Sequence, residues 1–195
     1  MSATTHPGPE EHHHHGEKLS GSALNGLAFS ATAHCLTGCA IGETLGMIIG
    51  TSIGLSEWET VGLAVSLAFL FGYALTSLPL LRAGLALATV IPIALAADTF
   101  SIATMEIVDN AIMLAIPGAM EAGALNVLFW ASLSVALVIA GVVAFPVNRY
   151  LIRRGKGHAV VHASGHHPDF PARTVGIVAA GMFAFGTAVL LAELL

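Results

Sequence analysis

Long apolar segments dominate this chain and restrict it to a membrane-spanning fold. Five of them, at about residues 23–55, 60–78, 83–117, 127–145 and 174–191, are separated by short polar segments. A helix needs about 20 apolar residues to cross a bilayer. Only 10% of the residues are charged and the mean hydropathy is +0.81, whereas about a quarter of residues are charged in soluble domains. We therefore expect an all-α, polytopic transmembrane helical bundle of about five spans.

Around these spans the sequence predicts three further regions. Residues 1–22 are polar and contain a run of histidines at 12–15, which is typical of a disordered tail. A four-helix membrane core is expected over 23–147, then a basic, His-rich loop over 148–173 and a fifth span within 174–195. Basic residues accumulate on the cytoplasmic side of membrane proteins. A cytoplasmic N-terminus places every Lys and Arg there: Lys18, Arg82, Arg149, Arg153, Arg154, Lys156 and Arg173.

The first span carries two stripes at intervals of four residues, which lie one above the other on a helix. The first stripe is a groove of small residues, and the second is a ridge of side chains that can bind ligands. Small residues let membrane helices approach closely, and packing alone explains the groove. The groove comprises Gly38, Gly42, Gly46, Gly50 and Gly54; the ridge comprises Cys35, Cys39, Glu43 and Met47.

The third span turns polar midway and contains Pro92, a predicted kink. On a helix, Met105 and Asp109 fall within about 20° of the direction of Asp98. Glu106 lies about 80° to one side, so these side chains share one broad face. An acidic side chain inside a span is costly, and its default interpretation is functional. We expect this face to lie beside the ridge of the first span, with the third helix entering the glycine groove.

Together the two faces predict a metal site. Thiolate and thioether sulfurs select soft ions such as Cu(I), whereas imidazole also accepts Zn(II). Copper is therefore the first candidate and zinc the second, although buried cysteines often act only as small apolar residues. The predicted ligands are His34, Cys35, Cys39, Glu43, Asp98 and Met105. Secondary candidates, at a mouth or in the basic loop, are Glu106, Asp109, His158, His162, His166 and His167.

Four separated motifs resemble a family of bacterial membrane proteins grouped as domain of unknown function 4396. They are ATAHCLTGCAIGETLG at 31–46, AADTFSIATMEIVDNA at 96–111, IPGAM at 116–120 and FPVNRYLIRRGKGH at 145–158. The resemblance covers roughly residues 20–165. It implies a multi-pass protein of the bacterial inner membrane, usually with four spans and often with His-rich ends. It implies no established activity, and the fifth span is an extension.

Other functions stay open at this level. The sequence has no phosphate-binding loop and no nucleophile motif, so we do not expect an enzyme. It has no basic stripe with interleaved aromatics, so nucleic acid is not an expected partner. One alternative is an accessory subunit that docks on a partner membrane protein, or on a second copy, through the groove from Gly38 to Gly54. Another is a redox component that uses Cys35 and Cys39 as a dithiol.

Overall fold

The structure is a computed structural model that describes residues 21–156. This part consists of four helices and has no strand: α1 (Gly21–Ser52), α2 (Glu57–Arg82), α3 (Leu87–Ala115) and α4 (Val127–Arg153). Each is long and apolar enough to cross a membrane. The prediction of a helical membrane bundle is therefore confirmed for four spans. The N-terminal tail, most of the basic loop with its four histidines, and the fifth span lie outside the described residues.

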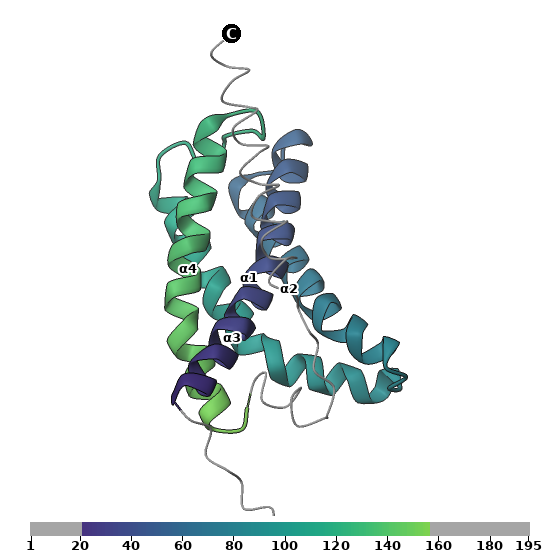
Figure 1. Cartoon of the computed structure of the whole chain (residues 1–195). Helices are drawn as coiled ribbons and strands as arrows, with labels where there is room; N and C mark the ends of the chain where they lie inside the picture. The colour runs from purple at the N-terminus through teal and green to yellow at the C-terminus, as the bar shows by residue number, and fades with distance from the viewer. Residues whose placement is uncertain (1–20, 157–195) are drawn as a thin grey trace, which may run out of the picture.

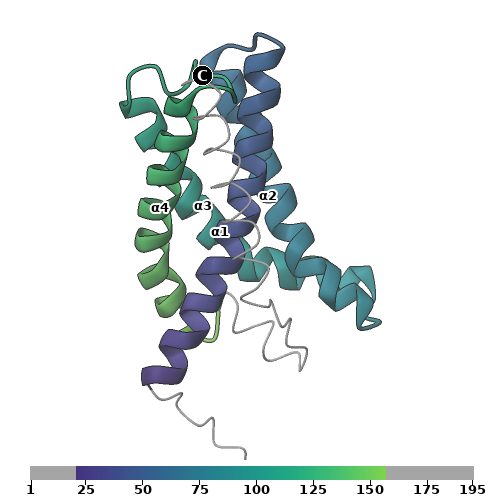
Figure 2. The ribbon, with the colours of Figure 1, turned by 45° about the horizontal axis from the view of Figure 1, so that its top comes forward.

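Helix α1 occupies the middle of the bundle, with α4 on one side and α2 on the other (Figures 1 and 2). It is the most buried of the four helices. Helix α1 packs antiparallel to α2 from His34 to Gly50, where it meets Thr76 to Thr60 of α2 in turn. Large apolar side chains such as Leu70, Phe100 and Val142 face outward, as expected for surfaces in contact with lipid.

The glycine groove of α1 is filled by α2. Along the groove, glycines at 38, 42 and 46 face Gly72, Ala68 and Ala64 of α2 in turn, and Gly50 faces Thr60. Our expectation that α3 enters this groove is wrong. Helix α2 occupies it instead, because its own small residues allow the backbones of α1 and α2 to come into contact. A partner protein could use these four positions only by displacing α2. The ridge of α1 is consequently left to face α3.

Two prolines at the ends of predicted spans do not interrupt their helices. The spans predicted over 60–78 and 127–145 stop directly before Pro79 and Pro146, yet both prolines lie inside helices, in α2 and α4. Prolines are tolerated inside membrane helices because neighbouring groups satisfy the freed carbonyls. As a result α4 continues to Arg153 and brings Asn148 into the bundle. Pro92 lies inside α3, and α3 changes direction along its length (Figures 1 and 2).

The two ends of the bundle differ in charge. Arg82 ends α2, and Arg153, Arg154 and Lys156 end α4 or follow it, so all lie at the end where α1 begins. We call this the basic end. The acidic end carries Glu57 and Glu59 at the start of α2 and Glu121 between α3 and α4. The assignment of the basic end to the cytoplasm stays a prediction.

Candidate functional site

A column of polar and sulfur-containing side chains runs along the interface between α1 and α3. It can be divided into three levels, each made by a residue of the α1 ridge and its neighbours. The lower level contains Cys35, the middle level Cys39 and the upper level Glu43, in order from the basic end to the acidic end. One helical turn separates successive levels, because the three residues are four apart.

The lower level joins three helices. The Cys35 thiol lies 3.7 Å from Oδ1 of Asp98. His34, the neighbour of Cys35 in the chain, is hydrogen-bonded through Nε2 to the Thr76 hydroxyl of α2 at 2.7 Å. Thr76 also interacts with Asp98. His34 and Asp98 are therefore connected through a threonine that sequence reasoning did not single out.

Asn148 attaches α4 to the same level. Its amide nitrogen donates hydrogen bonds to the hydroxyl oxygens of Thr32 on α1 and Ser101 on α3, both at 3.0 Å. The side chain is 2% exposed. We missed this residue because Pro146 was expected to end the fourth span. Continuing the helical pattern through the proline would have placed Asn148 on the buried face.

The middle level is a contact between two sulfur atoms. Sγ of Cys39 lies 4.0 Å from Sδ of Met105, and these residues are 1% and 0% exposed. Both Cys35 and Cys39 are free thiols. Ile102, Ala68 and other apolar side chains surround the pair. The middle level is thus an apolar, sulfur-lined segment between two polar levels.

The upper level is acidic. The Asn110 amide donates to Oε1 of Glu43 at 3.0 Å, and the carboxyl groups of Glu43, Glu106 and Asp109 lie near enough to interact with one another. The three residues are 1%, 4% and 1% exposed. None of the carboxyl oxygens of Glu106 and Asp109 has a partner at normal hydrogen-bond length. Glu106 also faces the Cys39 thiol, which connects this level to the one below.

Within residues 21–156, no basic side chain lies beside this acidic level. Every Lys and Arg of the chain lies outside residues 19–81 and 83–148, so none sits in the middle of a described span. Carboxyl groups inside a membrane usually pair with a cation, take up protons or mark an ion pathway. The composition of the upper level therefore points to a cation or a proton as its partner.

Comparison with known proteins assigns the chain to a family. The family model Domain of unknown function (DUF4396) matches residues 26–157. The chain belongs to the DUF4396 family. No curated protein and no solved structure matches it. The resemblance noted from the sequence is confirmed, and the matched region contains α2, α3, α4, all but the first five residues of α1, and the whole column.

The DUF4396 fold distributes the six predicted ligands over three levels. His34, Cys35 and Asp98 lie in the lower level, Cys39 and Met105 in the middle, and Glu43 in the upper level. The secondary candidates Glu106 and Asp109 join Glu43. Between residues 21 and 156, no three His, Cys, Asp or Glu side chains come close enough to hold one metal ion. The six residues therefore do not form a single ligand shell.

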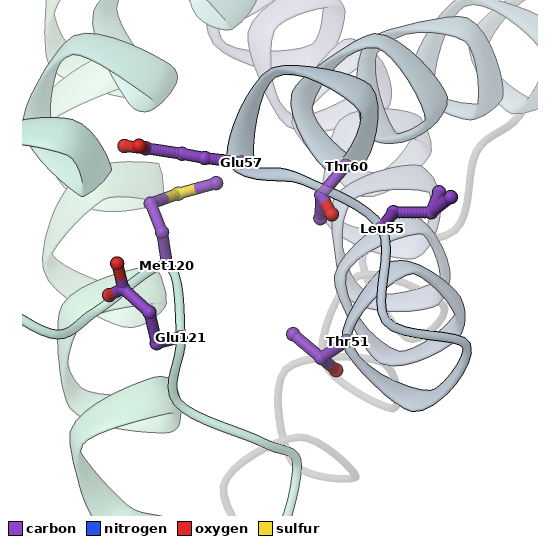
Figure 3. Close-up of a pocket in the computed structure, with 6 residues that line it drawn as sticks. All are labelled: Thr51, Leu55, Glu57, Thr60, Met120 and Glu121. Atoms are coloured by element: carbon purple, nitrogen blue, oxygen red, sulfur yellow. The ribbon is translucent and has the colours of Figure 1, made fainter.

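A pocket opens at the acidic end of this DUF4396 chain. It has a volume of about 250 Å³ and is lined by residues from the end of α1, the start of α2 and the loop after α3. Figure 3 shows Thr60 and Thr51 on one side and Met120 and Glu121 on the other. Glu57 also lines the pocket. Two carboxylates at this opening favour cations over anions.

Proposed function

We propose that this membrane protein binds Cu(I) inside the bilayer and passes it along the α1–α3 interface. The single observation that carries the proposal is the contact between Cys39 and Met105. Both sulfur atoms are buried, they come from different helices, and polar levels continue from them in both directions. The carboxyl groups of the upper level would balance the charge of the ion.

The spacing of the two sulfurs suits one bridging ion. The two sulfur atoms are 4.0 Å apart. A metal ion about 2.3 Å from each of them, a usual metal–thiolate distance, would have a sulfur–metal–sulfur angle of about 120°. Such an angle leaves room for a third ligand in the same plane. Cys35 lies one turn below Cys39 on the same face, so its thiol is the third candidate.

The arrangement favours copper over zinc. A structural zinc site takes four ligands, usually from Cys, His, Asp and Glu. No group of even three such side chains is assembled in residues 21–156. A thioether such as that of Met105 is a soft ligand that selects Cu(I). The thiol of Cys39 and the thioether of Met105 together form a pair of sulfur ligands, which suits Cu(I) better than Zn(II).

Movement of the ion would require the acidic level to change its charge. An ion leaving the sulfur pair toward the acidic end next meets Glu106, which faces both Cys39 and Glu43. Protons could replace it on the carboxyl groups, as in membrane proteins that relay protons along acidic side chains. We therefore propose exchange of Cu(I) against protons, with Asp98 performing the same role in the lower level.

Titration of the purified full chain with Cu(I), in competition with a colorimetric Cu(I) chelator, tests this function. Met105→Leu and Cys39→Ser should each weaken binding by about tenfold or more, equivalent to about 1.4 kcal/mol. Met113→Leu is the matched control, because Met113 is equally buried on α3 but packs in a different cluster, near Met47. Equal affinities for the wild type and Met105→Leu would reject the proposal, because Met105 would then not be a ligand of any copper that binds.

A further inference from the structure

A second opening reaches the acidic level from the side of the bundle. It is a groove of about 300 Å³ between α2 and α3, lined by Val61, Val65, Phe69, Ala103, Glu106, Ile107 and Asn110. Ile107 is 72% exposed, so the groove opens on the outer surface of the helices, which faces lipid. The volume lies at the lower limit for small-molecule pockets.

Glu106 is the one acidic residue that lines this largely apolar groove. It is 4% exposed, and neither carboxyl oxygen has a hydrogen-bond partner at normal length. A buried polar group without a hydrogen-bond partner is costly, so a donor that reaches these oxygens through the groove would be stabilised there. Glu106 lines the groove, and rotation about its side-chain torsions changes the direction of these oxygens.

The lining favours a particular ligand chemistry. Phe69 presents an aromatic ring in the same groove as the carboxyl of Glu106, and ammonium groups are attracted both to aromatic faces and to carboxylates. The other lining side chains are aliphatic, apart from Asn110. A molecule that satisfies all of these contacts has a hydrocarbon body and one protonated amine.

We infer that the α2–α3 groove binds a small lipophilic amine from the bilayer, with its ammonium group paired with Glu106. The inference does not depend on copper, because its contacts involve neither Cys39 nor Met105. It adds an organic ligand to a protein for which the geometry otherwise points to ions.

Carbodiimide labelling tests whether Glu106 can be reached from the lipid phase. N,N′-dicyclohexylcarbodiimide adds to a carboxylic acid: the carboxyl oxygen bonds to the central carbon, the acid proton moves to nitrogen, and no group leaves. In the full chain in lipid vesicles, mass spectrometry should locate the adduct on Glu106. Labelling at that position should be lost in Glu106→Gln and retained in Asp109→Asn, since Asp109 does not line the groove.

Protection then tests the ligand. N,N-dimethyloctylamine, a tertiary amine that cannot form an amide with the activated carboxyl, should slow labelling about tenfold when protonated. Octyl methyl ether, a neutral analogue of similar size, should not. Val65→Trp, which fills the groove from the α2 side, should reduce labelling while copper binding is retained. Absence of the adduct from Glu106, or equal protection by the ether and the amine, would overturn the inference.

Discussion

Gly42 of α1 lies so close to Ala68 of α2 that a Cβ on Gly42 would overlap the Ala68 backbone. The same close approach is repeated one turn away, where Gly46 meets Ala64. These contacts fix the rotation of α1 about its own axis. Cys39 directly follows Gly38 and Glu43 directly follows Gly42, so the ridge lies about 100° around the helix from the groove. With the groove against α2, this rotation determines that Cys39 and Glu43 face α3.

Gly42→Ala should therefore destabilise the protein strongly. The added methyl group meets backbone rather than a flexible side chain, so the helices must separate, at a cost of about 1–3 kcal/mol or more. Gly62→Ala is the matched control, because nothing lies within 4 Å of a Cβ at that helical position. Thermal unfolding in detergent should show a lower midpoint for Gly42→Ala alone. Equal midpoints for the two variants would contradict the packing described for α1 and α2.

Replacement of Asn148 should weaken the lower level. Asn148→Ala removes two hydrogen bonds that join α4 to α1 and α3. Interhelical hydrogen bonds in membranes contribute about 0.6–2 kcal/mol each. A double-mutant cycle with Ser101→Ala should yield a coupling energy of about 0.5 kcal/mol or more, the range for residues in direct contact. Additive effects would show that Asn148 and Ser101 do not interact in the membrane.

Glu43→Gln should lower Cu(I) affinity without lowering the stability of the protein. The glutamine oxygen can still accept the hydrogen bond from Asn110, while one of three interacting carboxyl groups is removed. We expect an unchanged or higher unfolding midpoint, by about 2–4 °C, the shift that about 1 kcal/mol produces in a chain of this size. Cu(I) affinity should fall, because a counter-charge is lost. Glu57→Gln, at the exposed start of α2, is the control for the unfolding midpoint. Lower stability with unchanged affinity would assign Glu43 a purely structural role.

The pairing of the α1 ridge with the polar face of α3 could be predicted from the sequence, but its register could not. Counted from the expected span starts at residues 23 and 83, Glu43 and Met105 lie about 20 and 22 residues in and would be level. In the structure Met105 contacts Cys39. The discrepancy arises because α3 begins at Leu87, one turn later than expected. Counted from the observed starts, Met105 lies 18 residues after Leu87 and Cys39 lies 18 after Gly21.

The other differences between the predicted and the observed site concern which helices contact each other, which the spacing of residues in the sequence does not determine. The glycine stripe predicts a close neighbour but not which helix provides it, and here α2 fills the groove. His34 looked like a metal ligand beside Cys35, yet adjacent residues on a helix point about 100° apart. Its ring consequently meets Thr76 on α2 rather than Met105. Thr76 itself carries no sequence signal, because threonines in membrane spans commonly bond to their own helix.

X-ray absorption at the copper edge, recorded on the full chain loaded with one equivalent of Cu(I), tests the central claim most directly. The account predicts two or three sulfur neighbours at about 2.3 Å. In Cys39→Ser and in Met105→Leu the sulfur shell should shrink, while Met113→Leu should match the wild type. A shell of nitrogen and oxygen alone, or a sulfur shell unchanged in both ligand variants, would contradict copper binding between Cys39 and Met105.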